Sequence, residues 1–176
     1  MTENKEMESR MEAEEPFHTT RIAAEPGGRE VVITQTYDAP RDKVFQLYAD
    51  PKMIPKWWGP RNLETTVEEM NLRHGGVWKI TQKDPNGNKY GFRGVYHDAL
   101  FPERVVRTME YDGMPGHVSL ETTVFEEKDG KTIVTTTTVF QTTEDRDGMV
   151  NSGMERGVKE SEERFNELLS QVGAPC

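Results

Sequence analysis

Four histidines are the side chains of this sequence most able to exchange protons or bind a metal near neutral pH. They are His18, His74, His97 and His117. Their positions lack the spacing that is typical of zinc ligands. The single cysteine, Cys176, is the last residue, where we expect neither a structural nor a catalytic role. We therefore predict no metal site, and a disulfide within the chain is excluded.

Two short motifs resemble ion-binding or phosphate-binding loops, but each lacks a required residue. Asp145-Arg146-Asp147-Gly148 begins like a calcium loop without the later glutamate ligand, so we interpret it as a turn before the last helix. Gly148 and Gly153 have the P-loop spacing, but Met154 stands where lysine is required. We predict no cofactor. Because no catalytic motif is recognisable, whether the chain is an enzyme stays open, and a non-catalytic role is favoured.

The segment Trp57-Trp58-Gly59-Pro60 places two large rings side by side in the sequence. Adjacent side chains point in different directions, so at least one ring faces away from the packed side of its own element. Leaving a large apolar side chain in water costs roughly 1.5–3 kcal/mol. The pair therefore indicates a ring that lines a cavity, covers its mouth or meets a partner. The alternative, that both rings fill an ordinary core, has equal weight on this dipeptide alone.

Further large apolar and sulfur-containing side chains share faces of the elements expected after this segment. Methionine adapts its shape, which suits variable ligands. Gly157 falls inside a helical pattern at a cost of about 1 kcal/mol against alanine, which suggests that a sheet or a ligand approaches the backbone there. From the residues alone, filling of an ordinary core is the better-supported interpretation. The candidate ligand-binding residues are Trp57, Trp58, Met70, Trp78, Tyr90, Phe92, Tyr96, Met109, Met154, Gly157, Val158 and Phe165.

A specific ligand in such a cavity would also need a few polar partners. The expected donors are Tyr90, Tyr96 and the indole N–H of Trp57, Trp58 or Trp78, with Arg107 and Glu121 as further candidates. Strand alternation argues against two other polar residues. It places Arg93 on the face opposite Phe92, and His97 on the face opposite Tyr96.

The composition is that of one polar domain with an acidic tail. The 176 residues are 34% hydrophobic and 30% charged, with a formal net charge of −9. This charge disfavours nucleic acid and anionic membranes as partners. Residues 1–16 hold six glutamates against two basic residues and are expected to be a disordered tail, with residues 17–176 forming a single domain. No signal peptide or membrane span is visible, so we expect a cytoplasmic protein.

The order of expected elements predicts an α+β fold. A strand over residues 29–37 precedes a helix with Asp38 as its N-cap, and a second short helix ends near Trp58. The six strands expected next cover residues 65–72, 77–82, 90–97, 104–111, 117–126 and 132–141. A long helix over residues 153–172 closes the chain. A twisted sheet around one long helix leaves room for a cavity between them.

The chain resembles the SRPBCC superfamily, also called START-like or birch-pollen-allergen-like. Within it, the chain is similar to the branch named for activators of the heat-shock chaperone ATPase. The resemblance is carried by Arg29-Glu30-Val31-Val32-Ile33, Asp38-Ala39-Pro40, Trp57-Trp58-Gly59-Pro60, Gly75-Gly76-Val77-Trp78, Pro102-Glu103-Arg104-Val105-Val106 and Gly153-Met154-Glu155-Arg156-Gly157. It implies a helix-grip fold, a curved antiparallel sheet of about six to seven strands wrapped around a long C-terminal helix. It also implies an apolar cavity between the two.

The function expected from this layout is binding of a small hydrophobic or amphipathic molecule in that cavity. One alternative is an enzyme of the cyclase or aromatase type that uses the same cavity. A second is a chaperone-interacting protein, which is disfavoured because the namesake of the branch has an N-terminal domain where this chain has a short acidic tail. A homodimer is also left open.

Overall fold

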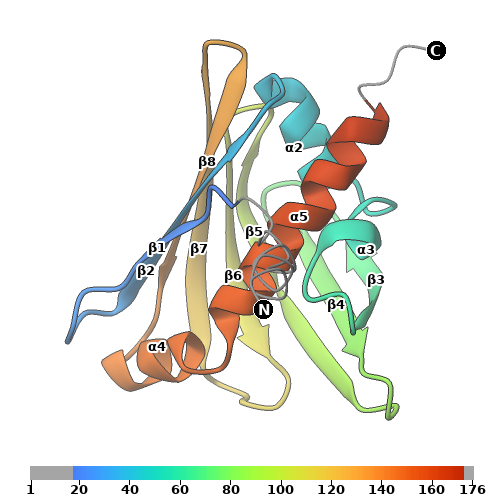
Figure 1. Ribbon diagram of the computed structural model, residues 1–176. Helices are drawn as coiled ribbons and strands as arrows, with labels where there is room; N and C mark the ends of the chain where they lie inside the picture. The colour runs from blue at the N-terminus through green and yellow to red at the C-terminus, as the bar shows by residue number, and fades with distance from the viewer. Residues whose placement is uncertain (1–17, 173–176) are drawn as a thin grey trace, which may run out of the picture.

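One antiparallel sheet of eight strands forms most of the molecule in the computed structural model, which describes residues 18–172 (Figure 1). The predicted tail, residues 1–16, lies outside the described residues. The strands follow the order β1-β2-β8-β7-β6-β5-β4-β3. They are β1 (Arg21–Ala23), β2 (Glu30–Tyr37), β3 (Glu64–Met70), β4 (Val77–Lys83), β5 (Lys89–Leu100), β6 (Arg104–Tyr111), β7 (Val118–Lys128) and β8 (Lys131–Val139).

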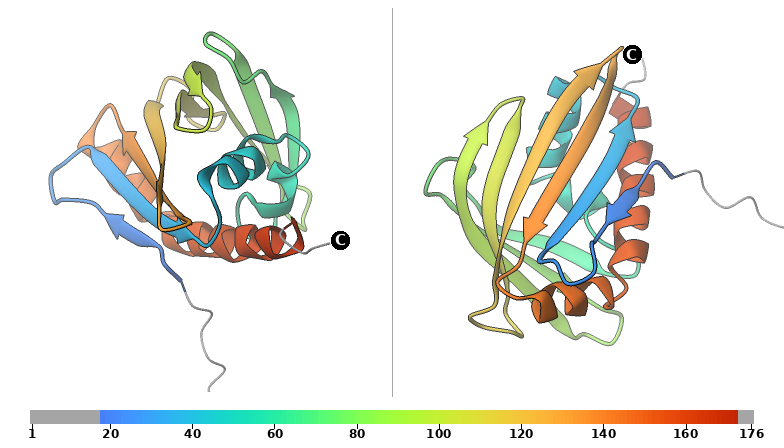
Figure 2. Two further views of the ribbon diagram at one scale, coloured as in Figure 1. Left: turned by 90° about the horizontal axis from the view of Figure 1, so that it is seen from above. Right: turned by 90° about the vertical axis from the view of Figure 1, so that its left-hand side faces the viewer.

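The described residues also form four helices, and the sheet curves around the longest of them (Figure 2). They are α2 (Arg41–Ala49), α3 (Ile54–Trp57), α4 (Thr143–Val150) and α5 (Met154–Val172). Helix α5 runs along the concave side of the sheet, and α2 and α3 lie inside the curve near one of its ends. This arrangement confirms the predicted α+β helix-grip fold, with eight strands in place of six to seven.

Two elements were not expected from the sequence. Strand β1 has only three residues, too few to show an alternating pattern, and it pairs antiparallel with β2. The segment interpreted as a turn around Asp145 is instead helix α4, whose first turn is capped by Thr142, with its Oγ1 accepting from the Asp145 N–H at 3.0 Å. Arg146 of this helix is buried and donates to the carbonyls of Glu25 and Glu30. Tertiary hydrogen bonds, not an apolar face, therefore hold α4.

The predicted cap of the first long helix was wrong. Helix α2 begins at Arg41, and the residue at its N-cap is Pro40, with no side-chain hydrogen bond to the first turn. Asp38 lies two residues before that position. The Arg41 N–H is satisfied from another element, because Glu127 on β7 accepts from it at 2.9 Å.

An aromatic cluster joins the C-terminal half of α5 to the sheet and the short helices. Phe165 is 2% exposed, with ring centroids 4.5 Å from Tyr37 and 5.2 Å from Trp57. Leu168, one turn later, is buried in the same cluster. Aromatic pairs at these separations contribute about 0.5–1.5 kcal/mol beyond the area that they bury.

A buried acid, Glu162, ties the start of the described chain to α5. Its side chain is 1% exposed, and its two carboxylate oxygens accept from the backbone and hydroxyl groups of Thr19 and Thr20. A carboxylate removed from water requires such partners. The helical pattern of the sequence places Glu162 on the apolar side of α5 but does not show what would pair with it.

Candidate functional site

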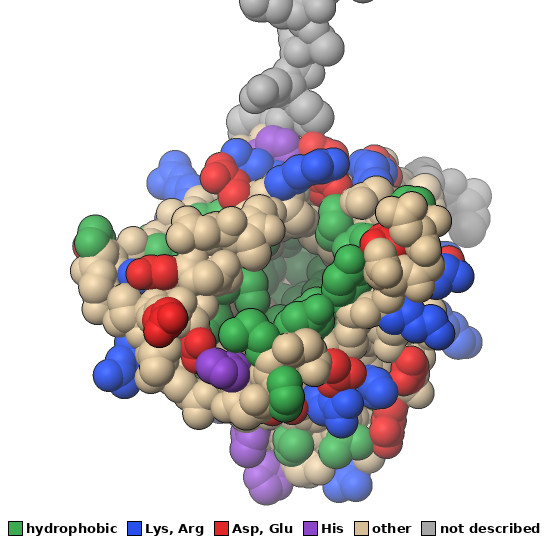
Figure 3. Space-filling view, turned by 90° about the horizontal axis from the view of Figure 1, so that it is seen from below, with side chains coloured by type: hydrophobic (Ala, Val, Ile, Leu, Met, Phe, Trp, Pro, Cys, Tyr) green, Lys and Arg blue, Asp and Glu red, His purple; other side chains and the backbone are tan. Residues whose placement is uncertain are grey.

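A cavity of about 510 Å³ lies between the sheet, the loop after α3 and the N-terminal half of α5. Figure 3 shows a hollow in the face seen from below, with hydrophobic side chains around it. Its apolar walls include Val31, Ile33, Trp58, Phe92, Met109, Phe140, Met149, Met154 and Val158. The volume is within the range of ligand pockets, roughly 300–1,000 Å³.

The sheet wall of this cavity carries one charged pair among apolar and hydroxyl side chains. Strand register places Arg107 of β6 opposite Glu121 of β7, and Glu121 opposite Thr138 of β8. The next row towards one end pairs Met109 with Ser119. All five residues line the cavity. A charged pair thus crosses the middle of a largely apolar surface.

Arg107 is held in place from several sides. Its Nε donates to Glu121 Oε1 at 2.9 Å, and its guanidinium lies 4.1 Å from the centre of the Trp78 ring. Burial lowers the pKa of Arg107, but Glu121 and the hydroxyls of Tyr48 and Tyr96 raise it by more, so the net pKa lies above its usual range. Arg107 is therefore a permanent cation in the cavity wall.

The N-terminal half of α5 presents small and flexible side chains to the cavity. Met154, Gly157, Val158 and Ser161 line it. Of the two expectations for Gly157, close approach of the sheet was wrong, whereas approach of a ligand stays a prediction. A Cβ atom built there would have Pro60 Cδ as its nearest neighbour, at 3.8 Å, which is an ordinary van der Waals distance. Open space, and not a crowded backbone, therefore surrounds Gly157.

The two adjacent tryptophans diverge. Trp57 points into the aromatic cluster, where its indole N–H donates to the Leu47 carbonyl at 3.2 Å. Trp58 faces the cavity, with its ring edge-on to Phe92 at a centroid distance of 5.4 Å. The Gly59 N–H donates to Ser161 Oγ at 2.9 Å and joins this turn to α5.

Arg164 clamps the same turn from the next helical turn of α5. Its guanidinium donates to the carbonyls of Lys56 at 3.0 Å, Pro55 at 3.1 Å and Gly59 at 2.9 Å. These carbonyls belong to the end of α3 and the residue pair that follows it, where intrahelical partners are missing. These hydrogen bonds hold Trp58 in place at the edge of the cavity.

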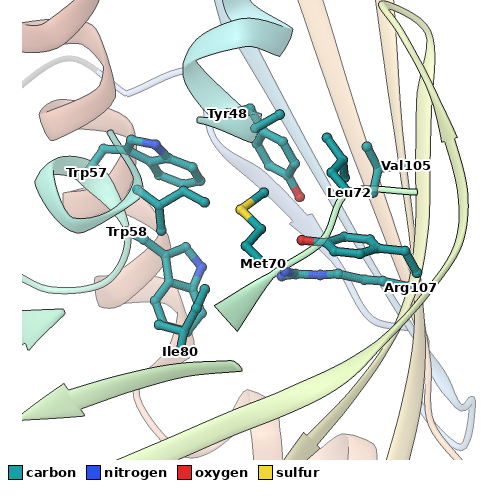
Figure 4. A pocket seen from close by; sticks show the side chains of 11 residues that line it. Tyr48, Trp57, Trp58, Met70, Leu72, Ile80, Val105 and Arg107 are labelled. Carbon is teal, nitrogen blue, oxygen red and sulfur yellow. The ribbon is translucent and has the colours of Figure 1, made fainter. Parts of the chain in front are cut away.

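A second, much smaller cavity of about 20 Å³ adjoins the first (Figure 4). Trp58 and Arg107 line both, while Tyr48, Met70 and Tyr96 line only the smaller one. Its volume suits a single water molecule. Burial raises the pKa of Tyr96 to about 12, although nearby Arg107 opposes part of this effect. Tyr96 is therefore neutral at physiological pH and can donate its hydroxyl proton.

The structure distributes the predicted site residues over three places. The larger cavity is lined by Trp58, Phe92, Met109, Met154, Gly157 and Val158. The smaller one is lined by Trp57, Trp58, Met70 and Tyr96. Trp78, Tyr90 and Phe165 line neither.

Each of those three residues has another partner. The Trp78 indole N–H donates to the Thr108 carbonyl at 3.1 Å, and its ring lies beneath Arg107. The Tyr90 hydroxyl donates to Asp84 in the hairpin turn at 3.1 Å. Phe165 belongs to the aromatic cluster described above.

Sequence reasoning missed the threonines of β8. Thr136 and Thr138 face the larger cavity, and Thr136 Oγ1 lies 3.3 Å from that of Thr123, which in turn lies 3.4 Å from the Tyr48 hydroxyl. The run Thr135–Thr138 showed only a β-strand preference. Its period of two could have shown that alternate hydroxyls share a face, but not that this face borders a cavity.

Solved structures similar to this one come from several bacteria. Protein Ms6760 from Mycobacterium smegmatis is 24% identical, with a TM-score of 0.77 over 85% of this chain and 96% of that chain. A protein from Rhodobacter sphaeroides is 21% identical, with a TM-score of 0.79 over 87% and 99% of the two chains. A protein from Arthrobacter aurescens is 22% identical, with a TM-score of 0.78 over 86% and 91%. These likenesses show a shared fold. Among curated proteins, none matches the sequence significantly.

A curved antiparallel sheet that grips a long C-terminal helix and encloses a cavity defines the SRPBCC class of proteins. The chain belongs to the family described as activator of Hsp90 ATPase homolog 1-like protein, whose model matches residues 38–170. This membership confirms the resemblance seen in the sequence. Within residues 18–172, no helix is long and apolar enough to cross a bilayer. The same residues contain no group of three or more His, Cys, Asp or Glu side chains that could hold a metal ion.

Proposed function

We propose that this protein binds a small amphipathic molecule in the larger cavity. The observation that carries the proposal is the combination of a 510 Å³ open-ended space, mostly apolar walls and one charged pair, Arg107 and Glu121, on the inner sheet surface. Ligand pockets typically combine an apolar lining with a few placed polar groups in this way.

The energetics favour a ligand that uses both kinds of surface. Burial of roughly 200 Å² of apolar ligand surface contributes about 5 kcal/mol at 25 cal/mol per Å². Association costs at least about 4 kcal/mol in lost translational and rotational freedom. Apolar contact alone therefore gives weak binding. The side chains of Arg107, Glu121 and Thr138 supply the polar contacts that a tighter ligand requires.

The direct test is titration with N-phenyl-1-naphthylamine, an uncharged probe whose fluorescence increases in apolar surroundings. We expect micromolar binding and quenching of tryptophan emission, because Trp58 lines the cavity. Gly157→Leu places a side chain beside Pro60 at the cavity wall and should weaken binding by at least about tenfold, or about 1.4 kcal/mol.

Gly148→Leu is the matched control. Gly148 lies exposed in α4, has no atom within 4 Å of the position that a Cβ would occupy, and does not line the cavity. Both substitutions improve helix propensity, so only the blocked space differs between them. Equal probe binding by the two variants would contradict the proposal. So would a wild-type protein that binds no probe together with a Gly157→Leu variant destabilised by about 1–3 kcal/mol, the effect of overpacking a filled core.

The enzyme alternative is distinguished by recovery of the bound molecule. Native mass spectrometry of freshly purified protein should show a bound small molecule, and incubation with that isolated molecule should return it with unchanged mass. A changed mass that depends on the protein would favour the cyclase or aromatase type of activity instead.

A further inference from the structure

The charge balance inside the larger cavity narrows the chemistry of its ligand. Among residues 18–172, three charged side chains line this cavity, namely Arg107, Glu121 and Arg156. The Arg156 side chain is 76% exposed and its Nε donates to Glu160 at 3.0 Å, so its charge belongs to the solvent-facing rim. One cation and one anion therefore remain in the interior, in direct contact.

The interior pair is fixed and largely withdrawn from water. The Arg107 and Glu121 side chains are 11% and 13% exposed, and they sit directly opposite each other on neighbouring strands. Trp78 supports the guanidinium from one face. An arginine side chain offers only donors, whereas an ionised glutamate offers only acceptors. The cavity wall thus presents donors and acceptors side by side in one defined orientation.

Stability alone does not account for this pair. Taking two charges out of water costs about as much as their attraction returns, and an apolar pair of similar size is often equally or more stable. The neighbouring rows of the same surface contain such apolar residues, among them Val105 and Met109. A charged pair in the wall of an apolar cavity is instead expected where polar recognition takes place.

A charged head group gains little from this pair. A carboxylate that approaches Arg107 also approaches Glu121, and an ammonium that approaches Glu121 also approaches Arg107. The attraction and the repulsion largely cancel, while the cost of removing the charged head from water remains. An uncharged head with its own donor and acceptor avoids that cost and can hydrogen-bond to both members. The hydroxyls of Ser119 and Thr138, which flank the pair, are also uncharged.

We infer that the ligand is a neutral amphiphile whose uncharged head, of the carboxamide type, both donates to Glu121 and accepts from Arg107 while its apolar part fills the cavity. This inference rests on the proposed function. It names the class of ligand that the same cavity selects.

Competition between three molecules with the same ten-carbon chain and different head groups tests this inference. Decanamide, decanoate and decylamine each displace N-phenyl-1-naphthylamine from the full-length protein at pH 7. We expect decanamide to bind at least about tenfold more tightly than either charged analogue, because only the amide avoids uncompensated desolvation of a charge. A preference of the wild-type protein for decanoate or decylamine would overturn the inference.

Substitutions of Arg107 and Glu121 test the inference more sharply than competition on the wild-type protein alone. Glu121→Gln leaves Arg107 as the unpaired interior cation, so decanoate should gain at least about tenfold relative to decanamide. Because a single change leaves a buried charge without its partner, the double variant Arg107→Met/Glu121→Met provides a form without interior charge. In that variant the amide should lose its hydrogen-bonding partners, and its affinity relative to decanoate should fall several-fold.

The exposed ion pair Arg104–Asp98, 2.6 Å between Nη2 and Oδ2, serves as the matched control. It lies away from the cavity lining, and Arg104→Gln/Asp98→Asn should retain the wild-type order of the three molecules. An order unchanged by both the Glu121 and the double substitution would overturn the inference, even with the probe bound normally. Absence of probe binding by the wild-type protein, together with a destabilised Gly157→Leu variant, would overturn the proposed function, and this inference with it.

Discussion

The two halves of helix α5 face very different surroundings. In the C-terminal half, Phe165 and Leu168 belong to the buried core, and the Phe165 ring packs against rings from β2 and α3. In the N-terminal half, Gly157 and Ser161 face the cavity of about 510 Å³. One helix on one sheet thus borders both a packed core and an open cavity.

The difference arises from what lies between helix and sheet. At the C-terminal half, α2 and α3 fit inside the curve of the sheet and contribute Phe45, Leu47, Ile54 and Trp57 to the core. These side chains fill the space that the curvature creates. By contrast, no described residue of α2 or α3 lines the larger cavity, so the sheet itself forms the wall opposite the N-terminal half of α5. The fold can therefore tolerate an open interior at one end because the other end supplies the packing.

Truncation of the packed half should have the largest effect. We expect Phe165→Ala to lower the free energy of unfolding by about 3–5 kcal/mol, because it removes a buried ring that touches Tyr37 and Trp57. Met154→Ala, in the cavity half, should cost only a fraction of that, since its side chain borders open space. Urea unfolding measures both. Equal losses for the two variants would contradict the division of α5 into two halves.

Alkaline pH should separate a tyrosine of the interior from one at the surface. Burial raises the pKa of Tyr96 to about 12, whereas an unfolded tyrosine ionises near 10. The folded state holds this proton longer, so its contribution to stability is complete below pH 10 and is lost as the pH rises to about 12. A pKa difference of about two corresponds to about 2.7 kcal/mol.

Tyr96→Phe should therefore reduce the loss of stability between pH 10 and pH 12 by up to that amount. Tyr90→Phe is the comparison. The hydrogen bond to Asp84 also raises the pKa of Tyr90, but it lies in an exposed hairpin turn, so this substitution should reduce the alkaline loss by less. Urea unfolding at several alkaline pH values gives the comparison. An identical alkaline loss in the wild-type protein and the Tyr96 variant would contradict the assignment.

Two glycines of the cavity wall should respond in opposite directions to alanine. Gly59 has a φ of +82°, and a Cβ atom there would lie 2.2 Å from Nε2 of Gln82. Left-handed backbone costs roughly 1–2 kcal/mol for a non-glycine residue, and the contact adds to that cost. We expect Gly59→Ala to destabilise by at least about 1 kcal/mol and to weaken probe binding by displacing Trp58.

Gly157→Ala should give the smallest effect, a gain in stability of about 0.5–1 kcal/mol. Its Cβ would meet only Pro60 Cδ, at 3.8 Å, so the gain in helix propensity is not offset by a clash. Thermal unfolding of Gly59→Ala and Gly157→Ala, measured together, provides the comparison. A loss of stability in Gly157→Ala would mean that this part of α5 is packed and not open.

Much of the architecture could be predicted from local patterns. The strand alternation and hairpin turns between residues 64 and 139 predict an antiparallel meander, and the helical period after Gly153 predicts α5. The two elements that were missed, β1 and α4, have no apolar period of their own. Their stability comes from pairing with β2 and from the hydrogen bonds of Arg146, which involve residues more than 100 positions away.

The candidate site, like the fold, could be predicted only where local patterns are informative. The amino-acid sequence by itself determined which side chains share a face of each element, and so part of the apolar lining, including Phe92, Met109 and Met154, but not Phe140 or Met149. Only the tertiary structure decided that Phe165 fills a core, that Trp58 borders a cavity, and that Arg107 meets Glu121 inside it. Periodicity reports the direction of a side chain relative to its own backbone. The space opposite depends on sheet curvature and strand register, which bring together segments distant in the chain.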